Sequence, residues 1–266
     1  MKTIYYFSGT GNSLYLGKIL KKNCSYNLVN LSAVIDEEVI LEGDIGIVFP
    51  IYAMGIPKIV EEFLKKVKIG KIDYFFAVAT CGGSGYGIPF NQIKNILNEK
   101  NIKLDYTNYC HMPDNYLKLF KPLSTEEAKK DINSSKEKID VISKHILNKK
   151  SFITKEKVFL YLGFLLIYKF WRYGLKKVSK SFKLNEKRCI SCGICMEVCP
   201  VNNIDLVEGK PIWNNNCEEC LACANLCPTI AISCGGKSKY DLRYKNPYID
   251  IKELKNNLKG RKNDKV

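Results

Sequence analysis

Short apolar runs alternate with stretches of helical periodicity through the first 150 residues. Five runs predict β-strands, at Lys2–Phe7, Tyr26–Leu31, Ile45–Phe49, Tyr74–Ala79 and Lys103–Cys110. Four stretches predict helices, at Ser13–Lys22, from Pro57 to Val67, around Phe90–Leu97 and at Thr125–Asn148. Continuous apolar strands that alternate with helices are typical of parallel sheets covered on both faces. The pattern therefore predicts a five-stranded, doubly wound α/β domain.

The pattern changes after residue 150. Val158–Tyr168 is an uninterrupted apolar run flanked by basic residues, and it is shorter than the roughly 18–20 residues that cross a bilayer. We therefore expect no transmembrane span there. The predicted organisation is an α/β domain at 1–150, a basic apolar connecting segment at 151–183, a cysteine-rich domain at 184–236 and a basic tail at 237–266. We expect the end of the tail to be mobile.

The formal net charge of +15 is unevenly distributed. Residues 151–188 hold 10 Lys and Arg against 2 Asp and Glu. A local excess of this kind indicates a docking surface, and the chain carries no zinc-finger or aromatic RNA-binding signature, so we expect no nucleic-acid partner. Two interpretations of the segment stay open. It forms a helix that packs the two domains together, or residues 155–180 dock an acidic partner or contact an anionic membrane peripherally.

Twelve cysteines and the absence of signal-peptide features at the start predict a cytoplasmic protein whose cysteines bind metal rather than form disulfides. Eight of them form two copies of C-x2-C-x2-C-x3-C-P, at Cys189, Cys192, Cys195 and Cys199 and at Cys217, Cys220, Cys223 and Cys227. The offset of 28 residues indicates an internal duplication. Structural zinc sites usually pair two C-x2-C units or include His, and this region has no His, so the spacing favours iron–sulfur clusters.

Residues 184–234 resemble bacterial two-cluster ferredoxins. In that family the fourth cysteine of each motif serves the other cluster. The resemblance implies one 4Fe–4S cluster on Cys189, Cys192, Cys195 and Cys227, and a second on Cys217, Cys220, Cys223 and Cys199. The remaining cysteines are weaker signals: we expect Cys24, Cys110 and Cys234 to be small buried side chains.

Residues 8–13, Ser-Gly-Thr-Gly-Asn-Ser, join the first predicted strand to the first helix. Backbone N–H groups, hydroxyls and a helix N-terminus favour a phosphate there. A dinucleotide-binding fingerprint needs a third Gly where Leu14 stands, and an acid where the second strand ends in Asn30 and Leu31. The single Gly-Lys-Ser, at 236–238, lacks the upstream Gly of a phosphate-binding P-loop. These two alternatives fail.

The same loop resembles the flavodoxin phosphate loop, matched by Ser8, Thr10, Gly11 and Ser13, with Asn12 between them. The resemblance implies FMN, and a flavodoxin-type sheet places its ligand at the carboxyl ends of the first and third strands. Two further loops fall where flavodoxins hold the isoalloxazine ring: Pro50, Ile51, Tyr52, Ala53, Met54 and Gly55, and Thr80, Cys81, Gly82, Gly83, Tyr86 and Gly87. Tyr52 or Tyr86 is expected to stack on the ring.

Together the two halves resemble the EFR-family ferrodoxins, which are flavodoxin–ferredoxin fusions. The start of the chain, the segment Met112–Tyr116 and the cysteine motifs carry the resemblance. It implies electron transfer between two 4Fe–4S clusters and FMN, which joins one-electron and two-electron steps, with a redox protein as partner. The alternative is an FMN-dependent oxidoreductase that reduces a small-molecule acceptor, using its ferredoxin domain as electron source. A lidded cavity over the flavin favours that alternative, and an exposed flavin edge favours the carrier.

Overall fold

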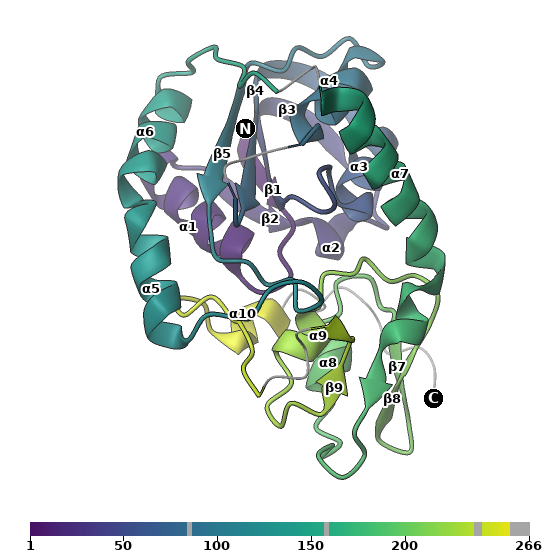
Figure 1. The fold of residues 1–266 in the computed structure, drawn as a ribbon. Helices are drawn as coiled ribbons and strands as arrows, with labels where there is room; N and C mark the ends of the chain where they lie inside the picture. Colours follow the sequence, from purple (N-terminus) through teal and green to yellow (C-terminus); the bar gives the residue numbers. More distant parts are fainter. Residues whose placement is uncertain (84–86, 157–159, 237–240, 256–266) are drawn as a thin grey trace.

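A five-stranded parallel sheet forms the centre of the N-terminal half (Figure 1). The computed structural model describes residues 1–83, 87–156, 160–236 and 241–255. The strand order is β2-β1-β3-β4-β5, which is the order of flavodoxin-like sheets. The strands are β1 (Lys2–Tyr6), β2 (Asn27–Asn30), β3 (Ile40–Pro50), β4 (Lys68–Cys81) and β5 (Tyr106–His111). The five predicted strands are confirmed, and the carboxyl ends of β1, β3 and β4 meet at one edge.

Helices lie on both sides of this sheet in Figure 1, with α1 and α6 on one side and α3 and α4 on the other. Their bounds are α1 (Asn12–Cys24), α2 (Leu31–Val34), α3 (Lys58–Lys66), α4 (Pro89–Asn98), α5 (Thr125–Ser134) and α6 (Lys136–Leu147). The single helix predicted at Thr125–Asn148 was wrong, because the chain breaks at Ser135. The Ser135 side chain is buried and its hydroxyl donates to the carbonyl oxygen of His111 at 2.9 Å, which ties the break to the end of β5.

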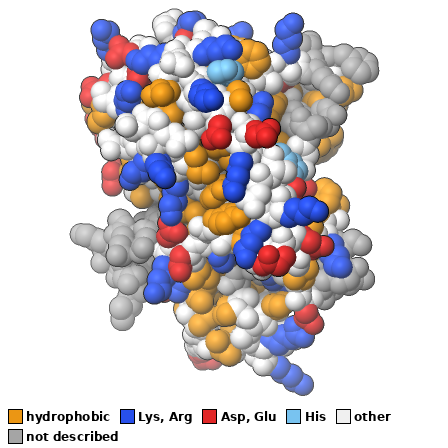
Figure 2. Space-filling view, turned by 90° about the vertical axis from the view of Figure 1, so that its left-hand side faces the viewer, with side chains coloured by type: hydrophobic (Ala, Val, Ile, Leu, Met, Phe, Trp, Pro, Cys, Tyr) orange, Lys and Arg blue, Asp and Glu red, His pale blue; other side chains and the backbone are white. Residues whose placement is uncertain are grey.

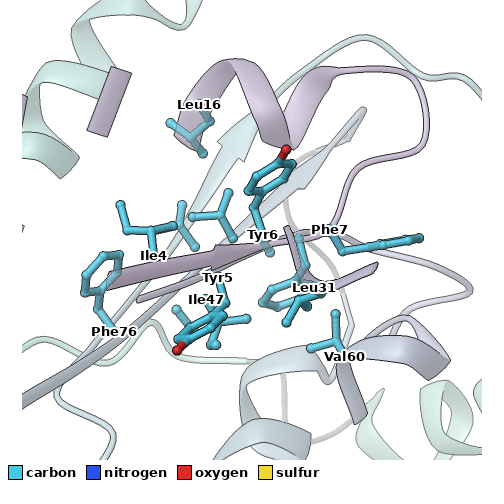
Figure 3. Close-up of a cluster of buried hydrophobic side chains, with 14 of the residues drawn as sticks. Ile4, Tyr5, Tyr6, Phe7, Leu16, Leu31, Ile47, Val60 and Phe76 are labelled. Carbon is cyan, nitrogen blue, oxygen red and sulfur yellow. The ribbon is translucent and has the colours of Figure 1, made fainter. Parts of the chain in front are cut away.

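The core of this half is apolar and aromatic (Figure 3). Side chains of β1 alternate between the two faces, so that Ile4 and Tyr6 lie on the α1 side while Tyr5 faces Val60 of α3. Tyr5 and Phe63 are in ring contact, with centroids 4.9 Å apart. The strands β3 and β4 begin earlier than predicted, because Ile40–Leu41 pairs with Lys68–Ile69 in a polar stretch that carries no apolar run.

The cysteine-rich half contains short elements only. They are β6 (Lys183–Leu184), α8 (Ile194–Glu197), β7 (Ile204–Val207), β8 (Lys210–Trp213), α9 (Ala222–Asn225) and β9 (Ile232–Ser233). β6 pairs with β9 and β7 with β8, both antiparallel. Left-handed backbone recurs with the sequence repeat: Ser191, Gly193 and Asn202 have positive φ, and so do Glu219, Leu221 and Ile230, each 28 residues later. The duplication is therefore structural as well as sequential.

Two further segments connect the halves. Helix α7 (Tyr161–Val178), with a 3-10 turn at Ser179–Ser181, runs along the side of the molecule from the sheet domain to the cysteine-rich half (Figure 1). The segment 241–255, which includes α10 (Ile251–Lys255), returns to the sheet domain, and Tyr244 and Ile249 are buried there. No helix in the described part of the chain is long and apolar enough to cross a membrane.

Candidate functional site

A cavity of about 720 Å³ lies at the edge of the sheet where β1, β3 and β4 end. The three loops predicted from the sequence converge on it. Its lining includes Ser8, Thr10, Asn12 and Ser13 from the first loop, Pro50, Ile51, Tyr52, Ala53 and Met54 from the second, and Thr80, Cys81, Gly82 and Gly83 from the third. Parallel strands bring their carboxyl ends to one edge, which explains why segments up to 75 residues apart meet here.

The loop 8–13 is held in shape by its own polar groups. Ser8 Oγ accepts a hydrogen bond from the Gly11 N–H at 3.1 Å, and Ser13 Oγ lies 2.8 Å from Thr80 Oγ1. Gly11 has φ +105°, a conformation that favours glycine. The loop leads directly into the 13-residue helix α1, so the positive end of that helix faces the cavity.

Three predicted residues support the loops without lining the cavity. A Cβ at Gly11 would lie 3.0 Å from the Cβ of Asn246, and one at Gly55 would lie 2.4 Å from the ring of Tyr168. Gly87 has φ +131°, and a Cβ there would lie 2.2 Å from the carbonyl oxygen of Met54. These glycines allow close packing around the site. Tyr86, the second predicted stacking residue, falls outside the described residues.

The outer wall of the cavity was largely missed by the sequence-based prediction. It comes from the segment after β5, from α7 and from the second cysteine motif, and consists of Met112, Pro113, Asp114, Asn115, Tyr116, Leu119, Phe120, Ile167, Trp171 and Glu219. Gly9 of the first loop also lines the cavity. Burial raises the pKa of Asp114, with His111 opposing the shift and Asp131 adding to it. The only signal in the sequence was the Met112–Tyr116 segment, whose position after β5 carried the family resemblance.

The returning segment closes over the loop 8–13. Asn12 Oδ1 accepts hydrogen bonds from the Tyr244 hydroxyl at 2.5 Å and from Asn246 Nδ2 at 3.0 Å. The Asn246 N–H donates to the carbonyl oxygen of Thr10 at 2.9 Å. Tyr15 of α1 stacks on Tyr248 with ring centroids 5.2 Å apart. The mobility expected for the end of the tail falls on residues 256–266, which lie outside the described residues. The first described part of the tail completes the loop 8–13.

The first group of cysteines lines a second, small cavity in the other half of the chain. Cys189, Cys192 and Cys195 lie there beside Cys227, the last cysteine of the second motif. The pKa of the Cys195 thiol is raised to about 11; burial is the largest cause, and the neighbouring Cys192, Cys227 and Cys189 contribute to the same shift. Cys227 therefore lies with the first motif.

The second group gathers Cys217, Cys220 and Cys223 around Cys199. Burial is the largest cause of the raised pKa of Cys217, which is about 12, and Cys199 adds to the shift. Burial raises the pKa values of Cys220 and Cys223 well above the ordinary value. After burial, the nearby Cys199 makes the next largest contribution to both shifts. Thiols this buried stay protonated unless a metal or cluster takes the place of the proton.

Backbone N–H groups point at the cysteine sulfurs in a repeated pattern. The Asn203 N–H donates to Cys199 Sγ at 3.2 Å, and the Ala231 N–H, 28 residues later, donates to Cys227 Sγ at 3.3 Å. The Trp213 Nε1 atom is buried, and its N–H lowers the pKa of Cys223 as a donor toward that sulfur. Hydrogen-bond donors around the cysteine sulfurs are one means by which proteins adjust the reduction potential of an iron–sulfur cluster. The described residues contain no group of three or more His, Cys, Asp or Glu placed to hold a single metal ion.

The cavity and the second cysteine group are in direct contact. A Cβ at Gly9 would lie 2.9 Å from the carbonyl oxygen of Cys220 and 3.2 Å from its Cβ. Asn115 Nδ2 donates to Thr10 Oγ1 at 3.0 Å and to the Cys220 carbonyl oxygen at 3.4 Å. The Tyr52 hydroxyl is buried beside them without a hydrogen-bond partner in the described chain. The loop 8–13 and the Cys220 loop thus share one boundary.

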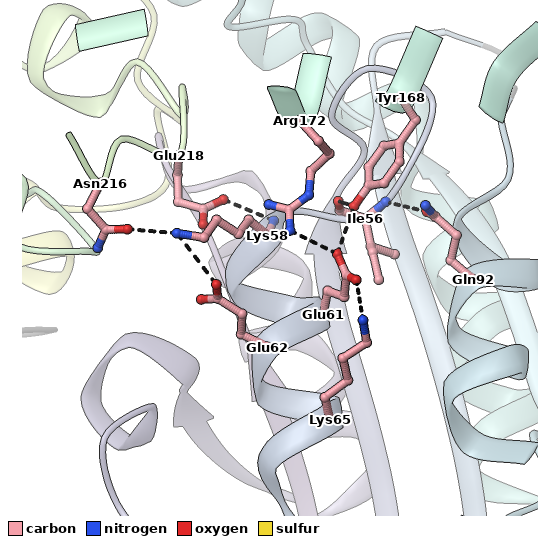
Figure 4. A network of polar contacts seen from close by, with 10 residues as sticks. All are labelled: Ile56, Lys58, Glu61, Glu62, Lys65, Gln92, Tyr168, Arg172, Asn216 and Glu218. Carbon is pink, nitrogen blue, oxygen red and sulfur yellow. Dashed lines mark hydrogen bonds and ion pairs between the residues drawn. The ribbon is translucent and has the colours of Figure 1, made fainter. Parts of the chain in front are cut away.

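A network of ion pairs and hydrogen bonds fixes the position of α7 against this boundary (Figure 4). The Tyr168 hydroxyl donates to the carbonyl oxygen of Ile56 at 3.0 Å, and Arg172 pairs with Glu61 of α3 at 3.2 Å. At the first residue of α3, the Lys58 N–H donates to Glu218 at 3.1 Å. Glu218 follows Cys217, so the network links α3 to α7 and to the second cysteine motif.

Comparison with known proteins agrees with the cysteine pattern. Residues 182–205 match the family described as the 4Fe–4S binding domain. One component of the ion-translocating oxidoreductase complex of Buchnera aphidicola subsp. Acyrthosiphon pisum (strain APS) is 35% identical to this chain over 94 residues. The match covers 31% of this chain and 19% of that protein, so the chain spans about a fifth of the length of this relative. The chain therefore contains a 4Fe–4S binding domain, which makes it an iron–sulfur protein.

Proposed function

We propose that this protein is an electron-transfer iron–sulfur flavoprotein, in which a doubly wound, flavodoxin-like domain binds FMN and a ferredoxin-like domain holds two 4Fe–4S clusters. The observation that carries the proposal is the contact between Gly9 in the cavity and the backbone of Cys220. Electrons pass readily only between centres that lie close together, and this contact brings the edge of one site to a ligand of the other.

The residues around the cavity fit FMN. Ser8, Thr10 and Ser13 bring hydroxyls to the N-terminal end of α1, and no Lys or Arg is among the described lining residues. Hydroxyls, backbone N–H groups and the helix end would hold the phosphate. The apolar walls from the second and third loops, with Tyr52 and Trp171, would hold the isoalloxazine ring. FMN accepts one or two electrons and so joins the one-electron clusters to two-electron chemistry.

The cysteine groups fit two clusters with crossed ligands. We assign Cys189, Cys192, Cys195 and Cys227 to the first cluster and Cys217, Cys220, Cys223 and Cys199 to the second. Two observations support this assignment. Cys227 lines the cavity of the first motif, and Cys199 lies near enough to Cys220 and Cys223 to raise the pKa of both. The second cluster lies nearer the flavin, because Cys220 belongs to it.

A second candidate function is the FMN-dependent reduction of a small molecule. The observation that favours it is the outer wall of Leu119, Phe120, Ile167 and Trp171, which covers the side of the cavity away from the sheet. A carrier that reacts with large partners at the flavin needs an open edge there. We propose a redox protein or a small-molecule acceptor as partner, and the cytoplasm as location.

The test is the cofactor content of protein purified without oxygen. We expect about one FMN, eight iron and eight sulfide per chain, and paired-cluster EPR signals after reduction with dithionite. Cys227→Ser and Cys199→Ser should each perturb a different cluster, with Cys227→Ser altering the one bound by 189–195. Cys24→Ala, in the sheet domain, is the matched control and should keep all iron. Clusters without flavin, even after FMN is added, would refute the flavin part alone.

A further inference from the structure

Helix α7 has an outer face that neither domain covers. Its inner face is accounted for: Tyr168, Leu175 and Val178 are buried, and Tyr168 and Arg172 bond to α3 and its leading loop (Figure 4). With the hydrogen bond from Trp171 to Glu219, this inner face agrees with one of the two interpretations of the segment, a helix that packs the halves together. It leaves the opposite face to be explained.

The outer face is a stripe of large apolar side chains. Leu162, Leu166, Phe170 and Tyr173 follow one another at spacings of four, four and three residues, which places them on one side of a helix. Leu162 is 68% exposed, Phe170 74% and Tyr173 70%. Isolated exposed apolar residues are ordinary on protein surfaces, but a contiguous row of them indicates a binding surface.

Basic side chains border this stripe and acidic ones are missing from it. Lys169, Lys176, Lys177 and Lys180 are exposed on or beside α7. The sequence from Lys157 to Asn185 contains no Asp or Glu. An exposed apolar stripe with a lysine border is the composition of helices that lie in the plane of an anionic membrane surface. At 18 residues and with basic residues along its second half, α7 suits lying on a bilayer rather than crossing it.

We propose that the outer face of α7 binds an anionic lipid surface. The side chains of Leu162, Leu166, Phe170 and Tyr173 enter the interface between headgroups and acyl chains, while the lysines reach the phosphates of the headgroups. Ile167 is half exposed at the edge of the same face and also lines the 720 Å³ cavity. Membrane binding through α7 therefore places the wall of that cavity next to the lipid.

Vesicle co-sedimentation of the purified full-length holoprotein tests this. Vesicles of phosphatidylcholine mixed with phosphatidylglycerol should sediment the protein, and vesicles of phosphatidylcholine alone should bind it far more weakly. The double variant Leu162→Gln/Phe170→Gln should lose at least about tenfold in partition coefficient. The triple variant Lys169→Gln/Lys176→Gln/Lys177→Gln should lose about fivefold for each lysine and lose its preference for the anionic vesicles.

The control changes exposed apolar residues on the opposite side of the molecule. Val141 and Leu147 lie on α6, on the side that Figure 2 faces, where apolar patches are interspersed with both basic and acidic side chains. Val141→Gln/Leu147→Gln should bind vesicles like the parent protein. Equal loss in this control, or no binding to anionic vesicles, overturns the proposal. Strong binding to soluble poly-glutamate without vesicle binding overturns it in favour of an acidic protein partner.

Discussion

Gly9 gives the sharpest test of how the two halves meet. The Gly9→Ala change adds a methyl group that would lie 2.9 Å from the carbonyl oxygen and 3.2 Å from the Cβ of Cys220. Ordinary contacts between such atoms lie at about 3.5–4.0 Å. The backbone of Gly9 has no positive φ, so the change introduces no conformational strain of its own. The Cys220 backbone cannot rotate away, and the two loops must separate by roughly half an ångström.

Overpacking of this kind costs about 1–3 kcal/mol. The matched control is Gly17→Ala, whose Cβ would also meet a neighbour at 2.9 Å. That neighbour is Cδ1 of Leu28, the end of a flexible side chain that can rotate. Gly17 is inside α1, where alanine is favoured over glycine by up to about 1 kcal/mol. The control should therefore be close to neutral.

Urea unfolding followed by circular dichroism and by cluster absorbance compares the two variants. We expect the unfolding midpoint of Gly9→Ala to fall, and the sheet domain and the cysteine-rich half to unfold in transitions that coincide less well. Under the proposed function, electron transfer between the clusters and the flavin should slow in the same variant. If Gly9→Ala is no less stable than Gly17→Ala, the boundary between the loop 8–13 and the Cys220 loop is not close-packed, and the reasoning fails.

Three further changes test single contacts. Glu156→Ala removes a half-buried carboxylate that accepts hydrogen bonds from the Phe90 and Asn91 N–H groups at 2.9 and 3.0 Å and from the Tyr109 hydroxyl. Thermal unfolding should show a loss of stability of about 2–3 kcal/mol, and Glu156→Gln should show a smaller loss. Tyr168→Phe should cost about 1 kcal/mol through the lost bond to Ile56, while Tyr173→Phe, on the exposed face, should cost nothing measurable. Asp114→Asn should stabilise the protein at neutral pH. Burial raises the pKa of Asp114 above its ordinary value of 3.8, so the folded state holds this proton more tightly than the unfolded state. The parent protein therefore loses stability as the pH rises from 3.8 to the raised pKa of the folded state. A stability gain that persists unchanged below pH 3.8 would contradict this assignment.

Much of the fold followed from local pattern. The strands of the sheet core, such as Ile45–Phe49, are buried on both faces and had to be apolar throughout, which made them visible in the sequence. The spacing of the cysteines was enough to predict 4Fe–4S binding. Cys24, Cys110 and Cys234 are buried as expected. These features depend on residues that are near one another in the chain.

The remaining features depend on distant pairings. Asn246 is fully buried against Thr10, but its own neighbours in the sequence are polar and basic and resemble a solvated tail. Trp171 and Glu219 meet at 2.6 Å across the wall of the cavity, and neither carries a motif. The break at Ser135 is stabilised by a bond to His111, 24 residues earlier, rather than by a Gly or Pro. Such contacts become visible only when the chain is folded.

The hydrogen bonds of Asn12 also set an order of events during synthesis. Its partners Tyr244 and Asn246 are 232 and 234 residues further along the chain. The N-terminal sheet can assemble while the ribosome is still translating the cysteine motifs, because domains generally form as units during synthesis. The loop at the start of α1, however, stays incomplete until the segment 241–255 has been synthesised. A chain that ends before residue 241 lacks these partners, so its loop 8–13 keeps Asn12 and the Thr10 carbonyl without the contacts that hold them in the folded protein.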